Sequence, residues 1–372
     1  MFRVLTVYYK HKPGGFCKRL KMKINAYLEQ GWTVHYIAVE SFPYNHPNLI
    51  PHILSTPFKN HDTIFFWIYF FTVSPWFIGW IAFKEKINLL SIFSLTYACL
   101  CAPAKWITKA PLLTFIRTRY GGKDSKIVSI LEHFLEKTGI YLSDSLVANS
   151  KSIKVELEKR DNPKKNIQIL YNNISPFEFN KAEYRQHILK EFGLEEDSFL
   201  IATTGLLIKR KNHFCLLKAF ANTEPTKAVL ILIGDGPLLN TLKTQVNKLG
   251  LKDNVIFTGW RQDVLEILPG CDLFIFPSLL EGLSNSILEA MTCNLPCLVS
   301  DIAENREIIT NPEQRFPVNQ PIILSKKINE VLHSSERLGH FHNSTMKDRN
   351  RFVFDWEAKI IEKAEEAMTL SP

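Results

Sequence analysis

Short runs of aliphatic and β-branched residues alternate with segments whose apolar positions recur at helical spacing. In the first half of the chain, the residues after Gly15 predict a helix with one apolar face, which ends at Gly31. The strands predicted there lie at residues 2–9, 34–39, 87–93, 112–116 and 145–148. This alternation is typical of parallel sheets covered by helices.

The second half repeats the alternation after a cluster of turn residues between Tyr171 and Pro176. The predicted strands lie at 199–203, 229–233, 255–258, 273–276 and 297–300, and the predicted helices at 238–249, around Glu289, at 306–309 and at 355–368. We therefore predict an α/β protein with an N-terminal domain at 1–175 and a second domain at 176–354. Residues 355–372 are expected to form a helix that packs back toward the first domain.

Length and composition fit this organisation. A chain of 372 residues suits two domains, and 46% hydrophobic with 22% charged residues is typical of a globular protein. The seven cysteines show neither disulfide nor metal-like spacing, which favours a reducing compartment. Because the chain starts directly in a strand-like run without a signal-peptide pattern, we expect a cytoplasmic location.

The positive charge of the chain lies in its first half. Residues 1–175 contain 23 Lys and Arg against 11 Asp and Glu, whereas the remainder is net negative. Such a domain suits an anionic partner such as phosphates or a lipid surface, unless the charges only form a solvated face.

The residues between Asp62 and Lys84 carry no charge, and ten of them are aromatic. The stretch is just long enough to span a bilayer, but Pro75 interrupts it and its aromatic side chains are spread throughout. Three interpretations remain open for residues 63–83: an in-plane contact with a membrane surface, a buried core helix and a true span. We favour the in-plane contact, because aromatic rings prefer the lipid–water interface.

A strand that ends in Pro277-Ser278 leads into a loop with Glu281 and then into a helix that carries Glu289. In an open α/β sheet, ligands bind beyond the carboxyl ends of the strands, where free N–H groups of a helix N-terminus suit phosphate oxygens. The residues that would offer those N–H groups are Leu283, Ser284, Asn285 and Ser286. The spacing alone fits equally well a helix with Ser284 as its N-cap and two solvated glutamates.

The segment from Glu281 to Met291, with two glutamates separated by seven residues, closely resembles the family-four glycosyltransferases. Other landmarks of that family occur in chain order: Gly14-Gly15, Asn149-Ser150-Lys151, Gly205 with Lys211-Asn212, Gly234-Asp235-Gly236-Pro237, Phe257-Thr258-Gly259-Trp260 and Asn305-Arg306-Glu307. The resemblance covers nearly the whole chain and is strongest in the second half. It implies the GT-B fold, in which two Rossmann-like domains with parallel sheets face each other across a cleft.

By this resemblance, Glu289 would hold the ribose of a nucleotide-diphosphate sugar of UDP or GDP type, and Glu281 would contact the transferred sugar. Lys211 would neutralise the diphosphate as charge develops on it. Gly15 would bring a first-domain loop close to the phosphates and the acceptor.

Trp260 and Arg261 would lie near the nucleobase in the same scheme. No Asp-x-Asp pair occurs in the chain, so we expect no metal and no cofactor other than the donor sugar itself. Lys211 and the helix N-terminus would act in place of the metal. The resemblance also implies that the sugar keeps its anomeric configuration.

Two positions of the second half depart from the family pattern. Leu206 stands where the family often has an arginine directly after a glycine. Lys209 or Arg210 would replace that cation, unless both are solvated. Asn294 replaces a glycine but tolerates a left-handed conformation, so the turn should be preserved.

In the first half, the chain lacks the histidine that many relatives have after the fourth strand. It carries Arg117 and Arg119 there instead. We expect Arg117 to contact the sugar or a phosphate, unless it is a surface cation.

These features together favour a hexosyltransferase of the EC 2.4 class that acts on a lipid-linked, membrane-associated or polysaccharide acceptor. We expect it to lie on the cytoplasmic face of a membrane as a peripheral protein. Alternatives are another GT-B activity, such as a nucleotide-sugar 2-epimerase or an α-glucan phosphorylase, and a catalytically silent nucleotide-sugar-binding subunit. A nucleic-acid partner is not expected, because the basic residues are not interleaved with aromatic ones.

Overall fold

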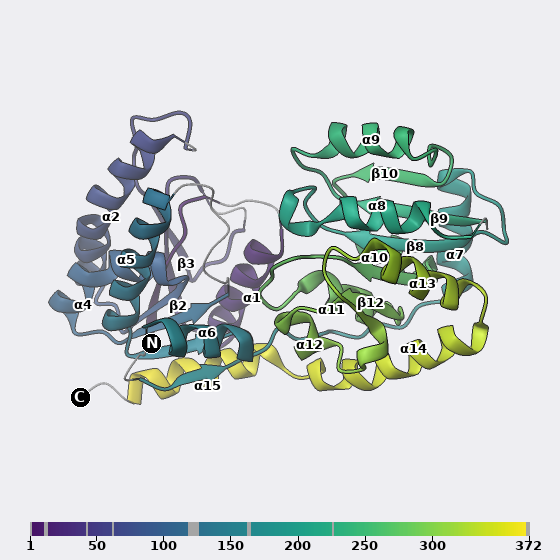
Figure 1. The fold of residues 1–372 in the computed structure, drawn as a ribbon. Coiled ribbons are helices and arrows are strands. Elements are labelled where there is room, and N and C mark those ends of the chain that lie inside the picture. Colours follow the sequence, from purple (N-terminus) through teal and green to yellow (C-terminus); the bar gives the residue numbers. More distant parts are fainter. Residues whose placement is uncertain are drawn as a thin grey trace. The chain divides into compact units, whose positions relative to one another are not determined.

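The computed structural model describes residues 2–10, 14–41, 44–61, 63–117, 126–161 (side chains from Ile130 onward), 165–224 and 227–369. The chain divides into two compact units, coloured purple to blue with a yellow last helix and teal to yellow-green in Figure 1. The first unit comprises Met1–Tyr171 and Asp355–Pro372, and the second Asn172–Phe354. The division coincides with the cluster of turn residues in the sequence.

The first unit is built on a parallel sheet whose order, within the described residues, is β3-β2-β1-β4-β5-β6-β7. Its strands are β1 (Arg3–Val7), β2 (Thr33–Ala38), β3 (Leu49–Ile53), β4 (Leu89–Phe93), β5 (Leu112–Ile116), β6 (Ser145–Ala148) and β7 (Ile167–Ile169). The chain first adds strands on one side of β1 and then returns to place β4 on its other side. The junction of β1 and β4 is therefore a topological switch point, where ligands bind in such sheets.

Helices cover both faces of this sheet. They are α1 (Gly15–Glu29), α2 (Ile64–Lys84), α3 (Leu95–Ala98), η1 (Cys99–Cys101), α4 (Ala102–Thr108), α5 (Lys126–Leu142), α6 (Lys151–Asp161) and α15 (Trp356–Thr369). Leu5 and Leu90 belong to a core that includes residues of α2 and α4. The adjacent Thr6 and Ser91 accept hydrogen bonds from Lys23 of α1. Because successive strand residues point to opposite faces, α1 lies on the other face from α2.

Helix α2 is the uncharged aromatic stretch of the sequence. Phe66, Phe70 and Ile78 are fully buried in the core of the first unit, so α2 is part of the fold along most of its length. Within the described part of the chain, α2 is also the one helix whose length and composition would allow it to cross a membrane. One face of α2 is thus a core face, and the other face is exposed.

The last helix, α15, completes the first unit. Trp356 at its start is buried, and the guanidinium of Arg19 on α1 lies 5.4 Å from the centre of its ring. Near its other end, Gln168 Nε2 donates a hydrogen bond to Glu366 Oε2 at 3.0 Å. The chain therefore leaves the first unit after Tyr171 and re-enters it at Asp355.

The second unit contains a parallel sheet whose order, within the described residues, is β10-β9-β8-β11-β12-β13. Its strands are β8 (Phe199–Thr204), β9 (Ala228–Ile233), β10 (Val255–Gly259), β11 (Leu273–Phe276), β12 (Cys297–Ser300) and β13 (Arg315–Phe316). Two strands lie on one side of β8 and the later strands on the other. The switch point of this sheet is therefore the junction of β8 and β11.

Helices and short turns pack around the second sheet. They are α7 (Lys181–Phe192), η2 (Lys209–Lys211), α8 (His213–Ala221), α9 (Leu239–Lys248), α10 (Val264–Ile267), η3 (Leu268–Gly270), α11 (Asn285–Thr292), α12 (Ala303–Ile308), η4 (Pro312–Gln314), α13 (Pro321–Leu332), α14 (Ser335–Arg349) and η5 (Asn350–Phe352). The fully buried Leu230, Leu273 and Leu298 come from three neighbouring parts of the sheet and share one core with residues of α8, α9 and α13. Their burial holds β9, β11 and β12 in place, and the candidate site described below lies in the loops at the ends of strands of this sheet.

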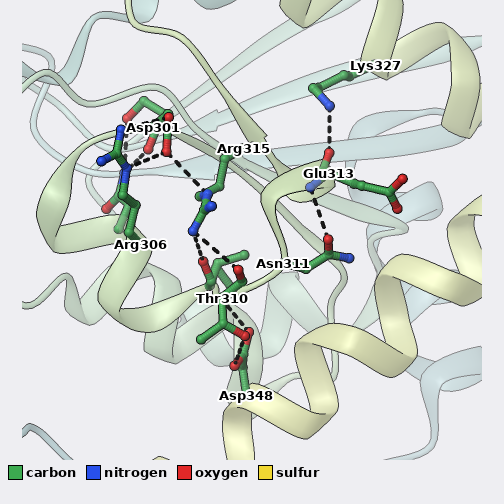
Figure 2. Close-up of polar contacts among 11 residues, drawn as sticks. Asp301, Arg306, Thr310, Asn311, Glu313, Arg315, Lys327 and Asp348 are labelled. Carbon is green, nitrogen blue, oxygen red and sulfur yellow. Dashed lines mark hydrogen bonds and ion pairs between the residues drawn. The ribbon is translucent and has the colours of Figure 1, made fainter.

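Figure 2 shows a polar network that holds the turn after β12. The carboxylate of Asp301 accepts two hydrogen bonds from Arg306, at 2.7 and 2.9 Å, and lies 3.2 Å from Nε of Arg315. Thr310 donates its N–H and its hydroxyl to the carboxylate of Asp348 on α14, at 2.7 and 2.8 Å. The Arg306 landmark of the sequence is therefore held by ion pairs within the unit.

A histidine pair in the first sheet gives the fold a testable dependence on pH. Nδ1 of His35 lies 2.9 Å from Nε2 of His52, and burial, reinforced by the His52 ring, lowers the pKa of His35 from 6.5 to about 4. The folded state thus disfavours the charged ring, and stability that is present above pH 6.5 is lost as the pH falls toward 4. We expect urea unfolding to show a loss of about 2 kcal/mol in this window, and a clearly smaller loss for His35→Gln. Equal pH slopes for the two proteins would contradict this assignment.

Candidate functional site

Two loops meet at the switch point of the second sheet. One follows β8 and contains the η2 turn, and the other follows β11. The N–H of Leu279 donates to the carbonyl of Arg210 at 2.8 Å, and Asn212 Nδ2 donates to the carbonyl of Pro277 at 3.3 Å. These bonds fix the position of Lys211, which lies between Arg210 and Asn212, relative to the second loop.

Lys211 and Glu281 form the centre of the site. Nζ of Lys211 lies 2.8 Å from Oε1 of Glu281, and only 12% and 9% of the two side chains are exposed. The same carboxylate oxygen accepts a hydrogen bond from the hydroxyl of Ser278, and the ammonium lies 4.6 Å from the centre of the Phe276 ring. A cation held in this way is shielded from water, so its charge acts strongly on any nearby anion.

Glu289 belongs to the same electrostatic cluster. Burial lowers the pKa of Lys211 below its usual range, while the carboxylates of Glu281 and Glu289 act in the opposite direction. Arg210 lowers the pKa of Lys211 further. Burial and the charge of Lys211 also lower the pKa of the adjacent His213 to about 4, so this imidazole is neutral at physiological pH. Lys211 and Glu281 are thus in direct contact, and Glu289 acts on Lys211 through its charge.

The start of helix α11 lies next in the chain. The hydroxyl of Ser284 accepts a hydrogen bond from the N–H of Ile287 at 3.4 Å, so Ser284 is the N-cap. Leu283 is buried, whereas Asn285 and Ser286 are partly exposed. The N–H groups of a first helical turn have no acceptor within the helix, and such an end favours an anion. The N-cap role and an anion-binding role of this segment are therefore compatible.

The loop after β8 is pressed against the turn after β9. Gly234 has φ of +148°, and a Cβ atom there would lie 2.0 Å from the carbonyl oxygen of Gly205. Leu207 donates its N–H to the carbonyl of Asp235 at 2.9 Å and accepts from the N–H of Leu238 at 3.0 Å. Only a residue without a side chain at position 234 permits this approach.

Leu206, which departs from the family pattern, and the two cations Lys209 and Arg210 lie at the surface of this loop. Leu206 is 57% exposed, and Lys209 and Arg210 are both exposed on the η2 turn. Only Arg210 of these two cations has a resolved electrostatic effect on Lys211. Asn294 adopts φ of +57°, which is the left-handed conformation expected from the sequence.

The residues expected near a nucleobase have different surroundings. Trp260 is 48% exposed. Arg261 donates to both carboxylate oxygens of Asp263 at 2.7 and 2.6 Å and also pairs with Glu191 on α7. These hydrogen bonds raise the pKa of Arg261 above its usual range. The side chain of Arg261 is thus anchored within the unit, whereas half of Trp260 is open to solvent.

The remaining nominated residues belong to the first unit. Gly15 begins α1, and Arg117 directly follows β5, with its guanidinium 5.2 Å from the centre of the Phe93 ring. Burial, together with the charge of Arg19, lowers the pKa of Arg117 to about 9. Arg119 lies outside the described residues. Both Gly15 and Arg117 are near the carboxyl end of a strand, where α/β sheets bind ligands.

Several polar residues of these regions were not nominated from the sequence. Ser278 orients Glu281, and Asn172 donates to Oδ1 of Asn285 at 2.7 Å. In the first unit, Lys23 is fully buried and donates to the hydroxyl of Thr6 and to the carbonyl of Ser91. The Pro-Ser step after β11 was the available signal for Ser278. Lys23 lies on an amphipathic helix, where a lysine is common, so nothing in the sequence indicates that it is buried.

The second unit matches a known family. Residues 185–348 match the family model described as "Glycosyl transferases group 1". The matched segment runs from within α7 to near the end of α14 and includes Lys211, Glu281 and Glu289. The second unit is therefore similar to the group 1 glycosyltransferases over most of its length.

Two curated relatives show how far the sequence similarity extends. The UDP-Gal:alpha-D-GlcNAc-diphosphoundecaprenol alpha-1,3-galactosyltransferase of Escherichia coli is 35% identical over 142 residues, which cover 37% of this chain and 36% of that protein. The N-acetyl-alpha-D-glucosaminyl L-malate synthase of Bacillus anthracis is 27% identical over 63% of this chain and 62% of its own length. The chain thus spans less than two thirds of the length of these relatives.

A solved structure matches over nearly the full length. HepE of Anabaena, crystallised in complex with UDP-glucose, aligns with 99% of this chain and 100% of its own, with a TM-score of 0.78 at 16% identity. At this identity the likeness establishes the fold alone. The two parallel, Rossmann-like sheets predicted from the sequence are therefore confirmed, and the fold is GT-B.

The contact between Gly234 and Gly205 predicts a sharp difference between two glycines. Gly234→Ala should cost about 3 kcal/mol or more and weaken nucleotide binding, because its Cβ would displace the loop that carries Lys211. Gly250 is the matched control, since its φ is also positive but a Cβ added there would have no atom within 4 Å. Gly250→Ala should therefore cost only about 1 kcal/mol and leave nucleotide binding unchanged. Thermal unfolding with and without UDP measures both effects.

Proposed function

We propose that the protein is a glycosyltransferase that moves a hexose-type sugar from a UDP- or GDP-type donor to a lipid-linked or polysaccharide acceptor, with retention of configuration. The observation that carries the proposal is the cluster of Lys211, Glu281 and Glu289 at the switch point of the second sheet. Its location agrees with the general rule for ligand sites in open α/β sheets. The match of the same segment to group 1 glycosyltransferases supports the reaction type.

Each member of the cluster has a role in this proposal. Lys211 contacts the diphosphate, and the N–H groups at the start of α11 bind its oxygens. Glu289, part of the way along α11, accepts hydrogen bonds from the ribose hydroxyls. Glu281, which Ser278 orients, contacts the sugar, and the half-exposed Trp260 contacts the nucleobase.

The proposed reaction forms a bond between an acceptor hydroxyl oxygen and the anomeric carbon of the sugar. The bond from that carbon to the diphosphate oxygen breaks, and the nucleoside diphosphate leaves with the electron pair. The acceptor proton passes to a phosphate oxygen or to solvent. Because negative charge grows on the leaving diphosphate, a pre-positioned ammonium and helix N–H groups lower the barrier.

The first unit is the proposed acceptor side. The Escherichia coli relative is named for a diphosphoundecaprenol-linked acceptor, which favours a lipid-linked acceptor here. Such an acceptor carries a diphosphate, and Arg117 and the start of α1 at Gly15 are the first-unit groups suited to it. An enzyme with this acceptor works at a membrane surface, and we propose a peripheral location on the cytoplasmic face.

Single substitutions test the donor site. Glu289→Gln should weaken binding of the UDP or GDP sugar about 10- to 100-fold, because charge-assisted hydrogen bonds to the ribose are lost. Lys211→Ala should lower turnover about 100-fold or more through loss of charge stabilisation. Lys243→Ala removes an exposed lysine of α9 and should change neither quantity. Isothermal titration and a donor-turnover assay on folded, thermally characterised proteins measure these effects; unchanged turnover in Lys211→Ala would refute the site.

The same cluster predicts a reaction that needs no divalent cation. Lys211 and the N-terminus of α11 supply the positive charge that a metal ion would otherwise bring to the diphosphate. We expect turnover to survive dialysis against EDTA and to show no stimulation by Mg²⁺ or Mn²⁺. Loss of activity in EDTA that added metal restores would show that the diphosphate is neutralised differently.

One observation favours a second candidate function. The exposed Leu206 occupies the position of a second cation, so a protein that binds a nucleotide sugar without transferring it remains an alternative. Product analysis of the wild-type turnover assay separates the candidates. Slow donor hydrolysis or transfer supports the enzyme, binding without turnover supports the silent subunit, and release of an epimerised sugar supports a 2-epimerase.

A further inference from the structure

Exposed large hydrophobic side chains gather on one part of the first unit. Among the described residues, 23 such side chains are exposed, and 12 of them lie on α2, α4 and α5. They are Ile64, Phe65, Ile68, Trp76, Trp80 and Phe83 on α2, Trp106 and Ile107 on α4, and Ile130, Leu131, Phe134 and Tyr141 on α5. We call these 12 residues the apolar surface. A concentration of this kind marks an interaction site rather than ordinary exposure.

The α2 part of the apolar surface runs along the whole helix. Its exposed positions recur every three or four residues, opposite the buried Phe66, Phe70 and Ile78. The exposed polar residue on this stripe is Thr72, whose hydroxyl lies 2.9 Å from the carbonyl of Ile68 and 3.0 Å from that of Tyr69. This hydroxyl therefore donates its hydrogen bond to the helix backbone rather than to water.

Helix α4 extends the surface sideways. A Cβ at Gly79 of α2 would lie 3.1 Å from Cβ of Pro103 and 3.5 Å from Cδ1 of Ile107, so the two helices cross closely at this glycine. Ile107 thus lies beside the stretch of α2 that carries Trp76 and Trp80. Without a side chain at position 79, the apolar residues of both helices form one surface.

Helix α5 belongs to the same layer. Both α2 and α5 contact the η1 turn, and Figure 1 shows α2, α4 and α5 grouped in the first unit. The exposed Ile130, Phe134 and Tyr141 recur along one side of α5. Its opposite side packs closely on α3, where a Cβ at Gly139 would lie 2.2 Å from the carbonyl oxygen of Leu95.

Charge on and near the apolar surface favours an anionic partner. Helices α2 and α4 contain no Asp or Glu, and Lys84, Lys86 and Lys109 are exposed at or just beyond their C-terminal ends. Glu85 lies between two of these lysines and 3.7 Å from Lys84, so the charge that remains at these helix ends is positive. The ammonium of Lys84 lies 5.1 Å from the centre of the Trp80 ring. Tryptophan with an adjacent lysine is the combination that anchors a helix at the headgroup level of a bilayer.

We propose that the apolar surface docks in the plane of an anionic bilayer, with the axis of α2 along the membrane. The core contacts of α2 oppose a transmembrane orientation, and the cationic ends match anionic headgroups rather than a neutral protein surface. The inference deepens the proposed function by naming the surface that brings the enzyme to a lipid-linked acceptor. The biological purpose of the docking surface rests on the proposed function. Membrane binding itself does not, since it is measured without any sugar.

Vesicle flotation of the full chain tests the proposal. The wild type should float with phosphatidylcholine vesicles that contain phosphatidylglycerol, and less with phosphatidylcholine alone. The combined variant Trp76→Ser, Trp80→Ser, Phe83→Ser should lower the floated fraction about tenfold or more, because three interfacial aromatic groups are lost. The matched control Val318→Ser, Ile322→Ser, Val353→Ser changes exposed apolar residues of the second unit and should float like the wild type.

Two further variants test the breadth of the surface. Trp106→Ser with Ile107→Ser on α4, and Ile130→Ser with Phe134→Ser on α5, should each reduce flotation severalfold. Unchanged flotation in both would overturn the three-helix surface. Alkaline carbonate should release the wild type from vesicles, whereas retention would overturn the in-plane orientation.

Other outcomes separate this proposal from the proposed function. Equal flotation of the wild type and the α2 variant would overturn the docking surface, as would self-association of the wild type in solution that the α2 variant abolishes. The thermal shift caused by UDP should be the same in the wild type and in the α2 variant. A wild type that floats but shows no shift with any nucleotide would refute the donor site while leaving the docking surface intact.

Discussion

The central physical constraint in this protein is the strand order of its parallel sheets. In each unit the chain builds strands outward on one side of its first strand and then returns to build on the other side. Loops that leave two neighbouring strands at that junction meet at the same edge of the sheet. In the second unit this geometry brings Lys211 to Glu281 across 70 residues of sequence, and the bond between Leu279 and Arg210 fixes the approach. The chemistry of the site depends on that meeting.

The elements with a strong apolar pattern could be predicted from the sequence, and the weakly patterned ones could not. Strands β5, β6, β11 and β12 have the predicted bounds, and every residue in them is buried. Strand β3 contains Pro51 and is mostly exposed, as expected for an edge strand, so it gives no clear signal. Strand β13 has two residues and is held by pairing with β12. Such pairing is a tertiary effect that local sequence does not encode.

Some residues of the candidate site could likewise be predicted from the sequence, and others could not. Glu281, Glu289 and Lys211 could be nominated because the segments that carry them resemble a known family, and Asn294 because its backbone requirement is local. Ser278 contacts Glu281 within one loop, only three residues further on, whereas the role of Lys23 depends on β1 and β4 becoming neighbours and so emerges only in three dimensions. Arg261 was nominated by position, yet its partner Glu191 lies on a distant helix and holds its charge within the unit. Sequence locates charged groups well but does not reveal their partners.

The path of the last helix has a consequence for how the protein is made. Because α15 packs on α1 with Trp356 buried, the first unit lacks this helix until residues 356–369 have been synthesised. The second unit, although translated later, is complete as soon as Phe354 emerges. Amino-terminal domains usually fold first during translation. Here the second unit can complete its fold before the first unit does. A chain that ended before α15 would therefore leave uncovered the part of α1, β4 and β5 that this helix contacts, and chaperones and proteases can recognise such a surface.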